Sequence, residues 1–174
     1  MLSKILAKSD CANCKFCCSF RRQSLWETPL FPAADIPALK KINSLAKFRP
    51  AGSTGTMYTF DISASYKTTD PNEEAACPFL DKSRGCTLPP QLKPFDCKIW
   101  PLRAVKVPGA NSETSQKIAV ALTPTCPAIN KVPLKTVCAL ASSGLGQKII
   151  SYSQENPDII KPYSQFLSNI VYEE

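Results

Sequence analysis

The sequence predicts an α+β fold, in which a small, loop-rich domain organised by cysteines and metal precedes C-terminal helices. Three observations lead to this prediction. Prolines outnumber glycines by 16 to 6, which favours extended and irregular connections. Nine cysteines occur, four of them within residues 11–18. The last third of the chain repeats apolar residues at helical spacing. We therefore expect a cysteine-cluster domain over residues 1–132 and a helical extension packed on it over residues 133–174.

Composition places the chain among ordinary globular proteins. Its 174 residues are 44% apolar and 20% charged, which is enough for one core. No apolar run reaches the 18 residues that would predict a membrane-spanning helix, and the first ten residues lack the apolar segment of a signal peptide. We expect a cytoplasmic protein without a membrane partner. The net charge of +7 is partly a counterweight to ionised cysteines.

The first elements are predicted from residues 34–62. Residues 34–48 form a short helix, with Asp35 as its cap and Ile36, Leu39, Ile42 and Leu45 along one side. Residues 54–62 are rich in Thr, Tyr and Phe and predict a strand. Further along, residues 102–107 and 117–122 are β-prone, so we expect a short hairpin or sheet joined by a long polar link.

Two helical patterns follow in the C-terminal third. The first is the stripe Leu134, Cys138, Ala141, Leu145, Ile149 and Tyr152, which Gly144 and Gly146 weaken. Within it, Cys138 is predicted to be a packed core residue. The second pattern follows the break at residues 156–158 and runs through Ile160, Tyr163, Phe166 or Leu167, and Ile170.

The chain contains no histidine, and this excludes several kinds of site. Imidazole-based catalytic triads, two-histidine zinc proteases, facial-triad iron and Rieske centres all need that residue. Any metal must therefore be held by sulfur or oxygen. No carboxylate pair suggests an acid–base couple, so no catalytic residue is predicted.

The cysteines have three competing interpretations. Disulfides need an oxidising compartment and do not suit an odd number with two adjacent members. Core packing suits a single cysteine but not four within eight residues. Metal ligation explains the spacing, because each C-x2-C turn places two sulfurs on one side of a tight loop. We favour metal, with these proposed ligands: Cys11, Cys14, Cys17, Cys18, Cys77, Cys86, Cys97 and Cys126.

Either an iron–sulfur cluster, [4Fe–4S], or zinc satisfies that ligand set. Three clustered cysteines with a remote Cys-Pro partner, as at Cys77 and Cys126, are typical of a cubane cluster. This layout favours iron–sulfur, although all-cysteine zinc sites also tolerate irregular spacing. The division of eight thiolates among one or two sites stays open.

The run Cys11-x2-Cys14-x2-Cys17-Cys18 resembles the signature of the CxxCxxCC cysteine-cluster family, also called YkgJ-like and described as zinc- or iron-chelating. The later segments 77–81, 85–88 and 93–101 follow the family's order of motifs, with Lys93 where arginine is usual. Residues 33–36 resemble the family's short helix start. The resemblance covers about residues 10–127 and implies metal binding. A flagellin lysine N-methylase carries a similar motif, which gives an enzyme as one alternative, but no glycine-rich cofactor loop is present.

Two classes of function follow from these observations. The first is a redox or accessory protein that carries a cluster. The second is a zinc-stabilised module that binds protein or nucleic acid. A protein partner is compatible with both classes. Basic and aromatic residues interleave around residues 15–26 and 93–103, but we expect them to cover a metal site rather than to bind nucleic acid. The expected cover is Phe16, Phe79, Phe95 and Trp100.

Overall fold

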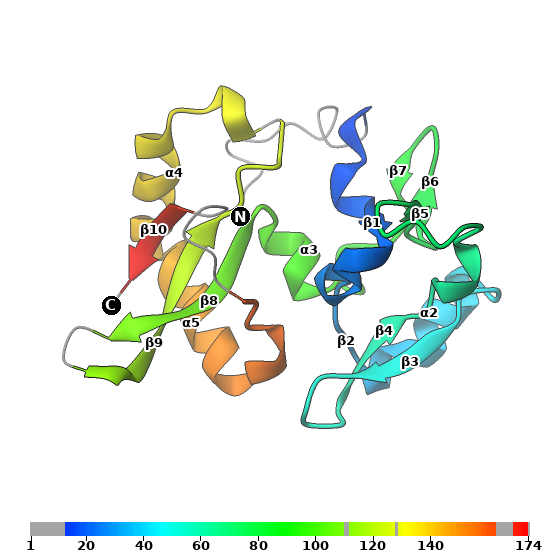
Figure 1. Ribbon diagram of the computed structural model, residues 1–174, viewed down its shortest axis with the longest axis horizontal. Coiled ribbons are helices and arrows are strands. Elements are labelled where there is room, and N and C mark those ends of the chain that lie inside the picture. Colours follow the sequence, from blue (N-terminus) through cyan, green and yellow to red (C-terminus); the bar gives the residue numbers. More distant parts are fainter. Residues whose placement is uncertain (1–12, 110–111, 128, 163–168, 174) are drawn as a thin grey trace. The chain divides into compact units, whose positions relative to one another are not determined.

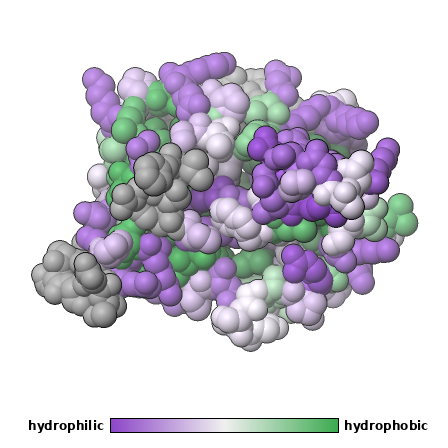
Figure 2. All heavy atoms as spheres, viewed as in Figure 1, coloured by the Kyte–Doolittle hydropathy of each residue, from purple (hydrophilic) through white to green (hydrophobic). Residues whose placement is uncertain are grey.

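The computed structural model describes residues 13–109, 112–127, 129–162 and 169–173. Helices and small sheets alternate along the chain, so the predicted α+β class is confirmed (Figure 1). The described residues up to Lys98 form one compact unit and those from Ile99 onward form another. Within these ranges no helix has both the length and the apolar character needed to cross a membrane. Hydrophilic residues cover most of the face seen in Figure 2.

The first unit consists of short elements joined by turns. Two strands pair as β1 (Ser19–Arg21) and β5 (Glu74–Ala76), and two more as β6 (Leu80–Asp81) and β7 (Gly85–Cys86). A three-stranded antiparallel sheet has the order β2 (Phe31–Pro32), β4 (Met57–Phe60) and β3 (Phe48–Ala51). The helical elements are η2 (Phe16–Cys18), η3 (Arg22–Glu27), η4 (Ala33–Asp35), α2 (Ile36–Ile42), η5 (Ser63–Ser65) and α3 (Phe95–Ile99), the last ending at the unit boundary.

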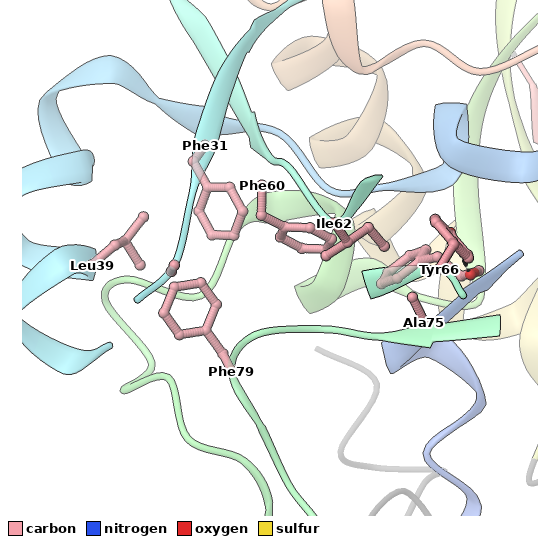
Figure 3. Packing of buried hydrophobic residues seen from close by; sticks show 9 residues of the cluster. Phe31, Leu39, Phe60, Ile62, Tyr66, Ala75 and Phe79 are labelled. Carbon is pink, nitrogen blue, oxygen red and sulfur yellow. Dashed lines mark hydrogen bonds between the residues drawn. The ribbon is translucent and has the colours of Figure 1, made fainter. Parts of the chain in front are cut away.

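Aromatic side chains make the core of this unit. Phe31, Phe60 and Phe79 are almost fully buried and turn their rings toward one another (Figure 3). Ring centroids are 6.3 Å apart for Phe31 and Phe60 and 6.2 Å apart for Phe31 and Phe79. Such tilted pairs add to the free energy of simple burial. Cys77 packs against the same cluster, so the aromatic core and the cysteine region share one scaffold.

Two predictions in this unit need correction. The expected helix over 34–48 ends at Ile42, and Asp35 makes no capping hydrogen bond. Asn43 stops the helix because its extended backbone allows its Oδ1 to accept from the amide of Leu45. Leu45, placed on the buried side by the pattern, is instead 86% exposed. The strand expected over 54–62 exists, but it is limited to β4.

The second unit is built on a longer sheet. β8 (Leu102–Gly109) and β9 (Ser112–Leu122) form the predicted hairpin, and β10 (Asn169–Glu173) pairs with the other edge of β9. The strands extend through most of the segment predicted to be a long link, because Pro108 pairs with Gln116 and Gly109 with Ser112 across a bulge. Val105, Val107, Ala119 and Ala121 form a small buried cluster.

Helices follow the hairpin. After η6 (Ile129–Lys131), the residues of the predicted stripe lie on α4 (Leu134–Leu140), η7 (Ala141–Leu145) and α5 (Gly146–Glu155). Ala141, Leu145 and Ile149 are buried as predicted, whereas Leu134 is 46% exposed. The segment η7 is π-helical, and Gly144 has φ of 102°, so the predicted weakness at this glycine is confirmed. The one-turn η8 (Pro157–Ile159) completes the helical elements.

The second helical pattern is wrong at its end. Ile170 lies on the strand β10, where Ile170 pairs with Ala121 of β9. Residues 163–168 lie outside the described part, so Tyr163, Phe166 and Leu167 are not placed. Pairing with the exposed edge of β9 satisfies backbone groups that a local helical pattern does not take into account. The hairpin and the described helices that follow it belong to the compact unit that begins at Ile99.

Candidate functional site

The pairing of β1 with β5 brings two distant cysteines together. Ser19 pairs with Ala76 in the antiparallel register, which places Cys18 opposite Cys77 at the next position. The amide of Cys77 donates a 2.7 Å hydrogen bond to the carbonyl of Cys18, so the ladder extends to this pair. The CxxCxxCC run and the Cys77-Pro turn thus meet at the end of one two-stranded sheet.

The thiols at this point form a chain of hydrogen bonds. Cys17 is hydrogen-bonded to Cys18, and Cys18 is hydrogen-bonded to Cys77. The amide of Phe79 donates to the Cys77 Sγ at 3.5 Å. Sequence reasoning missed this last contact, for which the Cys-Pro-Phe turn is the only local signal. Three sulfurs and one backbone donor are therefore already linked.

Two more cysteines lie within electrostatic range of these three. Cys86 ends β7, across the short hairpin from Leu80, and its charge acts on Cys18. Cys97 lies on α3, and its thiol is affected by the charges of Cys17 and Cys18. Asp96, next to Cys97, accepts a 3.1 Å hydrogen bond from the amide of Leu30, which ties α3 to the start of β2. Five cysteines from four segments of chain thus share one neighbourhood.

Ionisation of these thiols is unfavourable. The hydrogen bond to Cys18, burial and the neighbouring thiolate raise the pKa of Cys17 far above its usual range, while Lys93 opposes the shift. The hydrogen bond from Cys17 lowers the pKa of Cys18, but the bond to Cys77, burial and nearby thiolates outweigh it and raise that pKa to about 12. Burial, Asp96 and the same thiolates raise the pKa of Cys97. The positive charge of Lys93 therefore does not offset the effects of burial, hydrogen bonding and neighbouring negative charge on these thiols.

The chemistry of these donors fits a thiophilic metal, but their positions are those of paired thiols. Among the residues that the structure describes, no group of three or more Cys, Asp or Glu side chains is gathered as a metal site requires. The eight cysteines in the described part are free thiols, with no disulfide among them. In a hydrogen bond between thiols, the S–H of one sulfur points to the other sulfur. In a metal site, the lone pairs of all the thiolates point to the metal ion.

The remaining predicted ligands are placed differently. Cys11 lies outside the described residues. Cys14 is exposed, and it precedes the turn at Lys15, whose φ of 54° is left-handed. Cys126 belongs to the second unit and is only 6% exposed. Cys138, predicted to pack in the core rather than to bind metal, is only half-buried. The neighbouring residue Val137 is the one that is fully buried.

The residues expected to form the aromatic cover have other roles. Phe79 belongs to the aromatic core, whereas Phe16 is 39% exposed. The guanidinium group of Arg103 stacks over the ring of Trp100, 4.7 Å from the ring centroid. Trp100 therefore contacts a residue of its own unit. Asp81 caps its own turn by accepting from the amides of Ser83 and Arg84, which agrees with a structural role for this carboxylate.

Comparisons of the chain with family models, with curated proteins and with solved structures found no match.

Proposed function

We propose that the unit formed by residues up to Lys98 binds a metal through cysteine thiolates. The observation that carries this proposal is the shared neighbourhood of Cys17, Cys18, Cys77, Cys86 and Cys97. These residues come from η2, the turn after β5, the end of β7 and the helix α3. Packing alone gives no reason to gather five thiols from four segments.

Electrostatics supports a cation at this place. Hydrogen bonding and burial raise the pKa values of Cys17 and Cys18, burial raises the pKa of Cys97, and repulsion between neighbouring thiolates adds to all three shifts. A bound metal reverses this balance, because coordination deprotonates the thiol and supplies the missing positive charge. Lys93 already acts in the same direction on Cys17 and Cys97.

Cys11 and Cys14 belong to the same CxxCxxCC run as Cys17 and Cys18, so we include them among the proposed ligands. Cys126 is kept as a further candidate. The clustered layout of Cys11, Cys14 and Cys17 favours an iron–sulfur cluster over zinc. Such a cluster would supply one-electron transfer, so we propose a redox or accessory role. We assign the chain to a reducing compartment such as the cytoplasm, where thiols persist.

The proposal is tested by purifying the full chain without air and measuring metal and acid-labile sulfide. We expect brown protein containing iron and sulfide, with the colour lost in Cys17→Ser and Cys77→Ser. Stoichiometric zinc in colourless protein would overturn the choice of iron–sulfur and keep metal binding. Protein that takes up neither zinc nor iron under reducing conditions would overturn the proposal itself.

A further inference from the structure

We propose that Cys18 and Cys77 form a reversible disulfide that controls occupancy of the metal site. The pairing is inferred from the strand register alone. The control of metal occupancy also rests on the proposed function, since it assumes that both residues are ligands.

The backbone geometry suits this pair. Cys18 and Cys77 continue the register Ser19–Ala76, with the 2.7 Å hydrogen bond between their main chains. Opposed residues of an antiparallel ladder have Cα atoms roughly 4.5–5.5 Å apart. Disulfides span Cα separations of about 4.4–6.8 Å, so no backbone movement is needed. Directly opposed residues of an antiparallel ladder also place their side chains on the same face of it, so the register alone brings the two thiols together.

The adjacent pair Cys17–Cys18 is the obvious competitor and suits a disulfide poorly. These residues share one 3-10 turn, Phe16–Cys18, and are joined by a trans peptide bond. Consecutive Cα atoms across such a bond are about 3.8 Å apart. That separation is below the minimum of about 4.4 Å for disulfides, so a bond between the neighbours requires distortion that the cross-strand pair avoids.

The reaction balances with a peroxide as the oxidant. One thiolate of the pair attacks a peroxide oxygen, which breaks the O–O bond and leaves a sulfenic acid and hydroxide. The second thiol attacks that sulfur, the S–S bond forms, and the sulfenic oxygen leaves as water with the proton of this thiol. The proton that the first thiol released on ionising neutralises the hydroxide. Two thiols thus lose two electrons, and hydrogen peroxide becomes two waters. The product has two fewer anionic donors, so the remaining cysteines hold a metal less well.

The experiment uses the full chain loaded with zinc, which avoids oxidation of iron. Bound zinc is counted first, and hydrogen peroxide is then added in small steps. At each step free thiols are blocked, and tryptic peptides are analysed without reduction. We expect residues 16–21 to become linked to residues 68–82, with one zinc released for each disulfide. A thiol reductant should restore both the free peptides and zinc binding.

Matched variants identify the cysteine, because residues 16–21 contain both Cys17 and Cys18. Zinc-free chains are used for this step, so that loss of a ligand does not confuse the result. Cys17→Ser should keep the crosslink, whereas Cys18→Ser and Cys77→Ser should lose it. A crosslink that survives in Cys18→Ser, or that joins residues 16–21 to the peptide 85–98 instead, would overturn the pairing.

Two further outcomes separate this inference from the proposed function. Zinc that stays bound after complete formation of the Cys18–Cys77 disulfide would overturn the control of occupancy and keep metal binding. A chain that never binds metal, yet forms the Cys18–Cys77 disulfide, would overturn the proposed function and the control, while the pairing itself would stand.

Discussion

At the scale of single residues, Cys18 is the best connected of the described thiols. It is hydrogen-bonded to both Cys17 and Cys77, and the negative charge of Cys86 raises its pKa further. Cys138, by contrast, is half-buried on α4 in the other unit. The two residues therefore give a matched pair of cysteine variants.

We expect Cys18→Ala to lose bound metal and Cys138→Ala to keep it. Removing one sulfur from Cys138 should cost about 1 kcal/mol of folding free energy, which is typical of a point substitution. Metal content per chain and denaturant unfolding measure the two effects. Loss of metal in Cys138→Ala would show that this cysteine is a ligand.

Glu73 is a residue whose structural role depends on pH. Its carboxylate accepts hydrogen bonds from the amides of Lys67 and Thr68 and from the Thr68 hydroxyl, and it lies 3.5 Å from Arg22. The backbone donors lower the pKa of Glu73 from 4.5 to about 2. The folded state therefore favours the charged carboxylate, and this contribution is complete above pH 4.5 and lost as pH falls through about 2.

We expect Glu73→Gln to lower the unfolding midpoint at neutral pH, with the difference from wild type shrinking between pH 4.5 and 2. Thermal unfolding of the variant and the wild type across this pH range measures the difference between their midpoints. Glu74→Gln is the control, because its ion pair with Arg21 is about half exposed and contributes little. A difference for Glu73→Gln that does not change with pH would contradict the explanation.

At the scale of elements, two glycines shape the helical segment of the second unit. Gly144 has φ of 102° with open space around it, so a side chain there meets backbone strain alone. Gly146 starts α5 with helical backbone, but an added Cβ would collide with the ring of Tyr172 on β10. Strand β10 is thus packed directly against the start of α5.

We expect Gly144→Ala to cost roughly 1–2 kcal/mol through left-handed backbone strain. Gly146→Ala should cost roughly 1–3 kcal/mol through overpacking, despite the better helix propensity of alanine. Denaturant unfolding measures both costs. In the background of Tyr172→Ala, which removes the ring but keeps the Cβ, the second penalty should shrink and the first should persist. Equal penalties for Gly146→Ala in both backgrounds would contradict the contact.

At the scale of the whole molecule, the two compact units carry one tryptophan each. Trp26 lies on η3 in the first unit, and Trp100 lies in the second. The first unit has the cysteine neighbourhood and its own aromatic core. A single fluorescence probe can therefore follow each unit.

We expect removal of metal to destabilise the first unit selectively. Structural metal binding contributes on the order of 10–16 kcal/mol to folding in zinc-finger peptides. In Trp100→Phe, fluorescence of Trp26 should report a lower unfolding midpoint after chelation. In Trp26→Phe, fluorescence of Trp100 should report an unchanged one. Unchanged unfolding of the first unit after complete removal of metal would refute a structural role for the ion.

The sequence by itself determined what depends on composition and local spacing. It determined the α+β class, the hairpin of β8 and β9, the weak point at Gly144 and the exclusion of imidazole as a metal ligand, because prolines, glycines and the lack of histidine act locally. Only the tertiary structure decided that Ile170 lies on a strand, that Leu45 is exposed and that Cys18 faces Cys77. Strand pairing joins residues far apart in the chain, and its free energy has no local signature.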